Sequence, residues 1–120
     1  MAVSEVILGP STIILGMITC FLKYVIDPYQ IEAFEEYGRT WIDLVNDMGG
    51  THHGYLLPHE GANNIAYASF SFESMAAYEA YRNKIADRED CQKVLDKANE
   101  LKFIISYERS FMKPVFDGFK

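Results

Sequence analysis

The chain has 120 residues and a mass of 13.7 kDa, which fits a single domain with one hydrophobic core. Its 49% hydrophobic and 23% charged residues are typical of globular proteins and exclude a largely disordered chain. Seventeen acidic against eleven basic side chains give a net charge of -6, and the basic residues are scattered, so nucleic acid is not an expected partner.

We interpret residues 1–16 as a leader of uncertain structure, which precedes a single domain over residues 17–120. The apolar run over residues 13–22 is too short to span a bilayer, and no basic segment precedes it, so neither a membrane anchor nor a signal peptide is predicted. Cys20 and Cys91 fall in a predicted strand and a predicted helix, where buried reduced thiols are common. We therefore expect a soluble, cytoplasmic protein.

The first predicted strand covers residues 17–26, MITCFLKYVI, which are rich in β-branched and aromatic side chains and apolar on both faces. Residues 27–30, DPYQ, match a helix start, because they supply a capping acid, a proline for the first turn and a glutamine that can reach back. Apolar positions at helical spacing continue to Met48, and the glycine pair at 49–50 ends the helix.

Two further strands are predicted over residues 51–57 and 64–72, joined by a loop that contains proline, glycine and asparagine. A second helical stripe begins after Ser74, bends or breaks near Ala86 at an acidic segment, and then resumes. The last predicted strand covers residues 103–112. The order of the elements is therefore βαββαβ.

This order matches the ferredoxin-like fold of class α+β, in which both helical segments cover one face of a four-stranded antiparallel sheet. The other face would be left open, although the first and third strands carry apolar residues on both sides. Since the chain has no element left to cover that face, we expect a second copy of the protein to pack on it, sheet against sheet.

Four segments of the sequence are similar to a known family: CFLKYVIDPYQIEAFEEY, GANNIAYASFSFES, the helix around Arg82 and ISYERSFMKP. Taken in order, they resemble the NIPSNAP family, within the dimeric α/β-barrel superfamily of ferredoxin-like domains, over about residues 17–115. The resemblance implies a homodimer whose paired sheets form a barrel with a small cavity in each subunit. Related branches include cofactor-independent monooxygenases, haem-degrading enzymes and isomerases, whereas the NIPSNAP branch has no settled activity.

The chain departs from the family pattern on two strands. Family members often alternate Glu and Arg with Tyr on the first strand, where this chain has Cys20, Leu22 and Tyr24. On the third strand they often have His and Trp, where this chain has Ala68 and Phe70. These departures indicate a more apolar cavity than in the family. The matched position of Tyr24 implies that its side chain faces the barrel.

All three histidines fall within residues 49–64, GGTHHGYLLPHEGANN. Strand alternation places His53 and Tyr55 on one face and His52 on the other, while His59 belongs to a loop. Because the adjacent histidines diverge, convergent ligands are absent and no metal is predicted. We expect His53 and Tyr55 to face the barrel and His52 to face the helices.

The predicted site consists of His53 as proton acceptor and Tyr24, Tyr55, Tyr67 and Arg109 as substrate-binding residues. Imidazole exchanges a proton near neutral pH, and tyrosine combines an apolar ring with a hydroxyl group that can orient a substrate. The alternatives are a strand histidine that a neighbour satisfies, and an arginine that forms only a surface ion pair. Aromatic residues on the predicted helices are expected to serve packing.

The sequence thus predicts a homodimer that binds a small, mostly apolar organic molecule in its barrel cavity, without a cofactor. Its enzymatic form would be cofactor-independent oxygenation or isomerisation. The alternative is a non-enzymatic interaction protein, whose sheet face serves dimerisation only and whose cavity is filled by side chains. An empty cavity of drug-sized volume would favour the first hypothesis.

Overall fold

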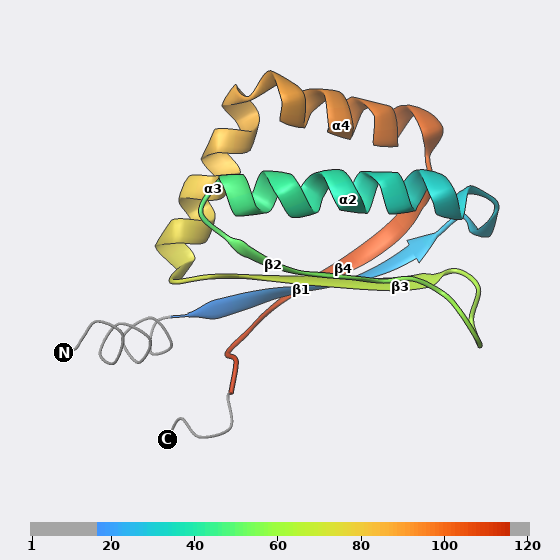
Figure 1. Ribbon diagram of the computed structural model, residues 1–120, viewed down its shortest axis with the longest axis horizontal. Helices are drawn as coiled ribbons and strands as arrows, with labels where there is room; N and C mark the ends of the chain where they lie inside the picture. The colour runs from blue at the N-terminus through green and yellow to red at the C-terminus, as the bar shows by residue number, and fades with distance from the viewer. Residues whose placement is uncertain (1–16, 116–120) are drawn as a thin grey trace.

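The computed structural model describes residues 17–115, which form a four-stranded sheet with helices on one of its faces (Figure 1). The strands are β1 (Ile18–Ile26), β2 (Thr51–Leu56), β3 (Ile65–Phe72) and β4 (Ile104–Met112). The helices are η1 (Pro28–Gln30), a short 3-10 turn, followed by α2 (Ile31–Asp47), α3 (Met75–Asp87) and α4 (Glu89–Leu101). The leader expected over residues 1–16 lies outside the described residues.

The strands pair in the order β2-β3-β1-β4, and each neighbouring pair is antiparallel. With the helices inserted after β1 and β3, this arrangement confirms the predicted ferredoxin-like fold of class α+β. β1 and β3 form the centre of the sheet and pair without interruption along the register from Ile18↔Phe72 to Val25↔Ile65. The pairing of two such sheets into a barrel concerns a second copy of the chain and stays a prediction.

The first helix begins and ends with the residues that the sequence indicates. Asp27 Oδ1 accepts a hydrogen bond from the Tyr29 backbone N–H at 2.9 Å, and Gln30 Nε2 donates to Asp27 Oδ2 at 3.0 Å. At the far end, Gly49 has a φ of +96°, and a Cβ added to Gly50 would lie 2.8 Å from an aromatic ring of β3. The helix can therefore turn into β2 only because both positions lack a side chain.

The helices cover the sheet unequally (Figure 1). α2 lies along the sheet, α3 rises from one end of it, and α4 lies on the far side of α2. β4 returns from the end of α4 to the edge of the sheet, where it pairs with β1. Tyr107 and Phe111 pair with the helix-facing residues of β1 and both stay exposed, although the Phe111 ring meets the Tyr78 ring of α3 at 4.8 Å.

The core lies between α2 and the central strands. One parity of β1 and β3 is buried there, namely Cys20, Leu22, Tyr24, Ile26, Ala66, Ala68, Phe70 and Phe72. The opposite side of the sheet, which includes Thr19, Phe21, Tyr67 and Ser71, is called the open face below. Phe21 and Tyr67 are only half-buried in this single chain, and their ring centroids lie 5.7 Å apart. The apolar character predicted for both faces is therefore present, but only the helix side is filled.

Both cysteines are free and buried, as the sequence predicts, with Cys20 in β1 and Cys91 in α4. Burial raises the pKa of each thiol, which favours the unreactive protonated form. Over residues 17–115, no helix has the length and apolar character needed to cross a membrane.

Candidate functional site

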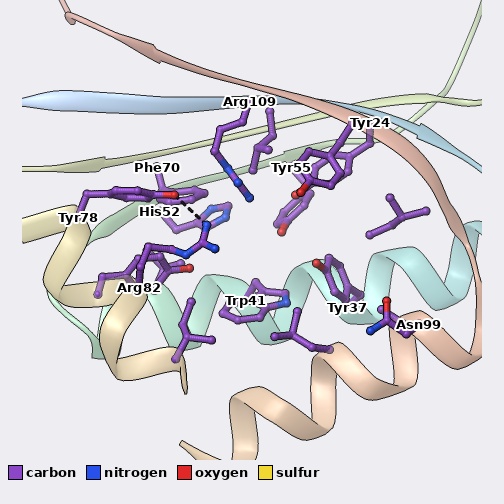
Figure 2. A pocket seen from close by; sticks show the side chains of 18 of the residues that line it. Tyr24, Tyr37, Trp41, His52, Tyr55, Phe70, Tyr78, Arg82, Asn99 and Arg109 are labelled. Carbon is purple, nitrogen blue, oxygen red and sulfur yellow. Dashed lines mark hydrogen bonds between the residues drawn. The ribbon is translucent and has the colours of Figure 1, made fainter. Parts of the chain in front are cut away.

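A pocket of about 580 Å³ lies between the sheet and the helices (Figure 2). All four strands and the helices α2, α3 and α4 contribute residues to its walls. The pocket follows from the fold, because α4 lies beyond α2 (Figure 1) and most residues of β4 stay exposed. Its volume lies within the range of about 300–1,000 Å³ that is usual for small-molecule sites.

Aromatic side chains form the inner wall of the pocket. The Tyr24 and Tyr55 rings stack with centroids 6.2 Å apart, and Tyr37 meets Trp41 edge to face at 6.2 Å. Gly38 of α2 makes room for this arrangement, since a Cβ added there would lie 3.0 Å from the Tyr55 ring. The wall therefore offers flat apolar surfaces to a ligand.

A bulge in β2 decides which of its residues reach the pocket. His52 and Tyr55 are three positions apart, yet they pair with residues of β3 that are two positions apart. Gly54 lies in this bulge with a φ of +99°, a backbone conformation that residues with a side chain rarely adopt. His52 and Tyr55 therefore share the pocket side, with stacked rings 5.0 Å apart. The expected pairing of His53 with Tyr55 is wrong, because the extra residue reverses the alternation.

His53 lies on the open face, where its Nε2 atom is 2.7 Å from Ser71 Oγ. Ser71 Oγ is also 2.7 Å from Thr19 Oγ1, so the imidazole joins a chain of hydrogen bonds across three strands. The expectation that the adjacent histidines diverge, with His52 toward the helices, is confirmed. The role of His53 as a proton acceptor stays a prediction, and it would have to act on the open face.

The predicted substrate-binding residues are divided between the two faces. Tyr24, Tyr55 and Arg109 line the pocket, whereas Tyr67 lies on the open face. The expectation that Tyr24 faces the barrel is wrong, because its ring packs against α2 on the helix side. Arg109 pairs with a pocket residue of β1 and points away from Glu108, and no ion pair joins the two.

The sequence did not single out His52 or Arg82 as pocket residues. An isolated glycine inside a strand pattern marks a bulge, so Gly54 was the signal that could have placed His52 correctly. Arg82 lies one helical turn after Tyr78, and its Nη1 donates a hydrogen bond to the Tyr78 hydroxyl at 3.1 Å. The aromatic residues of α2 and α3 serve packing as expected, and several of them line the pocket as well.

The pocket carries two guanidinium groups and no carboxylate among its lining residues. Arg82 comes from α3 and Arg109 from β4, and both are exposed. In the part of the chain that the structure describes, neither arginine forms an ion pair. Burial raises the pKa of the Cys20 thiol, and both arginines lie close enough to oppose that rise. Within a chain of net charge -6, the pocket is therefore a local positive region.

The phenol groups of the inner wall are neutral at neutral pH. Burial raises the pKa of Tyr37 to about 12. Burial, reinforced by neighbouring phenols, raises the pKa of Tyr24 and of Tyr55 well above the usual value. The same cause raises the pKa of Tyr81. These side chains can donate and accept hydrogen bonds, but they add no negative charge to the pocket.

Two buried N–H groups of pocket residues lack an acceptor. Burial, followed by the proximity of His53, lowers the pKa of His52 to about 4, so this imidazole is neutral. Its Nδ1 accepts a hydrogen bond from the Gly54 backbone N–H at 2.9 Å, which leaves the proton on Nε2. Within residues 17–115, neither His52 Nε2 nor Trp41 Nε1 has a hydrogen-bond partner. The pocket therefore presents more donors than acceptors.

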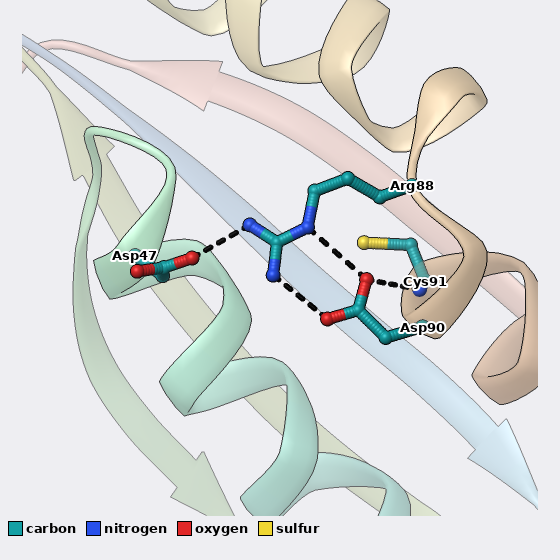
Figure 3. Close-up of polar contacts among 4 residues, drawn as sticks. All are labelled: Asp47, Arg88, Asp90 and Cys91. Carbon is teal, nitrogen blue, oxygen red and sulfur yellow. Dashed lines mark hydrogen bonds and ion pairs between the residues drawn. The ribbon is translucent and has the colours of Figure 1, made fainter.

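A polar cluster fixes the break between α3 and α4 and thereby the helix that roofs the pocket (Figure 3). Arg88 Nη1 donates to Asp47 Oδ2 of α2 at 2.6 Å, and Arg88 Nη2 donates to Asp90 Oδ2 at 2.7 Å. The Cys91 backbone N–H donates to Asp90 Oδ1 at 2.8 Å, and the guanidinium lowers the pKa of the Asp90 carboxyl. The predicted break near Ala86 thus occurs at Arg88, where α4 is tied to the end of α2.

The three histidines do not converge on one point. His52 and His53 lie on opposite sides of the sheet, and His59 lies exposed in the loop between β2 and β3. Among residues 17–115, no three His, Cys, Asp or Glu side chains are grouped so that they could hold a metal ion.

A family model supports the assignment of this chain. The NIPSNAP model matches residues 20–117, which is most of the sequence. A search of curated proteins found no match. The family therefore rests on the model match, and the solved structures add a comparison of folds.

The solved structures that resemble this chain include two NIPSNAP proteins. One is a NIPSNAP family protein from Agrobacterium tumefaciens, with a TM-score of 0.73 and 18% identity over 86% of this chain and 90% of that chain. Another is an uncharacterized NIPSNAP-like domain protein from Burkholderia xenovorans, with a TM-score of 0.71 and 17% identity over 85% of this chain and 88% of that chain. A putative antibiotic biosynthesis monooxygenase from Nitrosomonas europaea has a TM-score of 0.64 and 10% identity over 84% and 92% of the two chains. At these identities the likeness shows the fold alone.

Proposed function

The chain belongs to the NIPSNAP family, and we propose that it binds a small, mostly apolar organic molecule in the pocket between its sheet and its helices. The observation that carries this proposal is the aromatic pocket of about 580 Å³. A cavity filled by its own side chains, as in a pure interaction protein, would not leave such a space. The proposed site thus differs from the cavity expected between two paired sheets.

A flat ligand fits the walls of this pocket. The stacked pair Tyr24 and Tyr55 and the Tyr37 and Trp41 pair present ring faces and edges that favour aromatic or conjugated ligands. The neutral phenols supply polar atoms that can fix the orientation of such a ligand. For a ligand of drug-like size, we expect a dissociation constant in the micromolar range.

The test is a fluorescence titration with N-phenyl-1-naphthylamine, a neutral dye that brightens in apolar surroundings. Leu95 of α4 lines the pocket, and the Leu95→Trp variant should fill part of it. We expect this variant to weaken dye binding at least about tenfold, which corresponds to about 1.4 kcal/mol. The matched control is Val94→Trp, since Val94 is the preceding residue of the same helix and lines only a shallow depression between α2 and α4.

Circular dichroism of both variants establishes that they are folded. Equal dye affinities for the wild type and Leu95→Trp would contradict the proposal, as would the absence of any dye binding by the wild type. Loss of binding in Val94→Trp to the same extent would place the dye outside the pocket. Native mass spectrometry of the purified protein would then identify any ligand that it retains.

The enzymatic form of this proposal is cofactor-independent oxygenation or isomerisation of the bound molecule. The solved structure of a putative monooxygenase with the same fold makes this class relevant here. The pocket supports it through its donors and its two guanidinium groups, which would stabilise an oxyanion formed on the substrate. His52 is an unsuitable base, because its pKa is lowered to about 4 and its Nδ1 already accepts a hydrogen bond.

A second candidate function is homodimerisation through the open face. Leu56 is 68% exposed on this face and lies opposite Tyr67, whose half-buried ring is in turn next to Phe21. Apolar side chains exposed in one chain favour the packing of a second sheet on them. Light scattering tests this candidate, and Phe21→Ser should shift the protein toward the monomer. An unchanged mass for that variant would contradict the predicted interface.

A further inference from the structure

We propose that the molecule bound in the pocket carries a carboxylate, which Arg82 and Arg109 hold where the pocket meets solvent. This inference rests on the proposed function, because it concerns the same pocket and names the chemical class of its ligand. It changes the expectation from the sequence, which was a mostly apolar ligand, to an apolar body with one anionic group.

The two arginines have unused hydrogen-bonding capacity. A guanidinium group carries five N–H donors, and Arg82 uses one of them for the Tyr78 hydroxyl. Arg109 has its guanidinium carbon 5.2 Å from the centre of the Tyr107 ring. Because neither arginine has a carboxylate partner within residues 17–115, both can bind an anion that enters the pocket.

The two guanidinium groups extend into the same space from different elements. Figure 2 shows Arg109 descending from the sheet and Arg82 extending from α3 into the pocket. Both lie near enough to Cys20 to act on its thiol, which places them around the same part of β1. Planar guanidinium groups match the geometry of a carboxylate, so two of them on opposite sides form a suitable clamp.

The remaining polar groups of the pocket also favour a ligand with acceptor oxygens. Trp41 Nε1 and His52 Nε2 are buried donors without a partner in the described part of the chain. Buried polar groups are normally satisfied, so a ligand that supplies oxygen acceptors would complete them. A cationic ligand would meet two fixed positive charges and no carboxylate among the lining residues.

A second depression on the surface shows that this charge pattern is particular to the pocket. The depression between α2 and α4 has a volume of about 250 Å³ and is lined by Glu36, Lys93 and Lys97 among others. Glu36 and Lys97 form an ion pair at 3.2 Å, so charges of both signs are present there. None of the acidic residues within residues 17–115 lines the larger pocket.

The expected effect of each arginine is moderate, because both side chains are exposed and solvent screens their charges. We expect an anionic ligand to bind at least about fivefold more tightly than a neutral molecule of the same shape. High salt should reduce this preference, because added ions screen the two solvent-exposed guanidinium charges.

The experiment measures displacement of N-phenyl-1-naphthylamine by two competitors of the same shape, 2-naphthoate and 2-naphthamide. The wild type should bind the carboxylate at least about fivefold more tightly, and 0.5 M sodium chloride should reduce the difference. Arg82→Met and Arg109→Met should each weaken naphthoate binding about fivefold and leave naphthamide binding unchanged. Arg109→Lys keeps the charge but loses the planar fork, so it should restore part of the affinity.

The matched control is Arg39→Met, since Arg39 is an exposed arginine of α2 that pairs with Glu35 and does not line the pocket. It should leave both competitors unaffected. If the dye binds in the pocket but naphthamide competes as well as naphthoate, the carboxylate proposal is overturned while the proposed function stands. Arginine variants that leave the preference unchanged would overturn it in the same way. If the dye itself does not bind, both proposals fail.

Discussion

The two faces of the sheet use similar residues for different purposes. On the helix side, aromatic rings surround a pocket whose two arginines form no ion pair and whose two buried N–H donors have no hydrogen-bond partner in the described chain. On the open face, His53, Ser71 and Thr19 satisfy one another, and an aromatic pair stays half-buried. Unsatisfied polar groups in a cavity suggest a ligand, whereas satisfied groups on a flat surface suggest a contact with another protein.

The largest expected difference between the two faces is in the free energy of unfolding that is lost when one phenylalanine ring is removed from each. Phe34 is completely buried and touches aromatic residues on three sides of the core, so Phe34→Ala should destabilise the fold by about 3–5 kcal/mol. Phe21 is half-buried on the open face, so Phe21→Ala should cost about 1 kcal/mol in a single chain. Denaturant unfolding of both variants measures the contrast, and equal losses would refute it.

The bulge in β2 provides the next test, because it places His52 and Tyr55 on the same side of the sheet, facing the pocket. Gly54→Ala places a side chain at a φ of +99° and should cost about 2 kcal/mol. It should also weaken dye binding, since relaxing the bulge turns one ring out of the pocket. Gly61→Ala is the matched control, with a φ of +104° in an exposed loop, and it should lose stability without losing dye affinity. Similar dye affinities for the two variants would contradict the role of the bulge.

A smaller effect is expected from the protonation of His52. Its folded-state pKa of about 4 lies below the value of about 6.5 in an unfolded chain, so the unfolded state binds a proton first as pH falls. Stability is therefore complete above about pH 6.5 and decreases toward pH 4. Because His52 is partly exposed and solvent weakens the effect, we expect the free energy of unfolding to fall by about 1 kcal/mol.

Thermal unfolding between pH 7 and pH 4 measures this slope. His52→Gln should flatten it, because the neutral amide does not titrate, while His53→Gln should preserve most of it, because burial is the larger cause of the lowered pKa of His52 and the proximity of His53 the smaller one. The assignment of His52 to the buried side would be contradicted by identical slopes in the wild type and His52→Gln.

The smallest effect concerns the polar cluster that positions α4 over the pocket. Arg88→Met removes hydrogen bonds to Asp47 and Asp90 and should weaken dye binding by less than about fivefold. Arg39→Met is the control, because it removes an exposed ion pair within α2 that is remote from the α3–α4 break. A larger loss of dye affinity in Arg39→Met than in Arg88→Met would show that the cluster does not set the roof of the pocket.

Much of the fold could be predicted because its signals are local. The capping residues at Asp27 and Gln30, the glycine pair at 49–50 and the apolar periodicity place the elements within a few residues of where they occur. The break between α3 and α4 was also expected from the acidic segment, although it occurs at Arg88. These features depend on neighbours in the sequence and require no knowledge of the packed structure.

The site was harder to predict because it depends on register and on long-range packing. Regular alternation along β2 gave the wrong partner for Tyr55, and one glycine, Gly54, accounts for the error. The position of the pocket follows from α4 lying beyond α2, held in part by the contact of Arg88 with Asp47. That contact joins residues forty-one positions apart, so no local pattern predicts it.

The most direct test of the ligand pocket is a crystal structure of the protein with 2-naphthoate. We predict density for the naphthalene ring between the sheet and α2, against Tyr37 or Tyr55, with the carboxylate within hydrogen-bond distance of Arg82 and Arg109. Density for the ligand on the open face over Phe21 and Tyr67, or a pocket that stays empty at saturating ligand, would contradict the central claim.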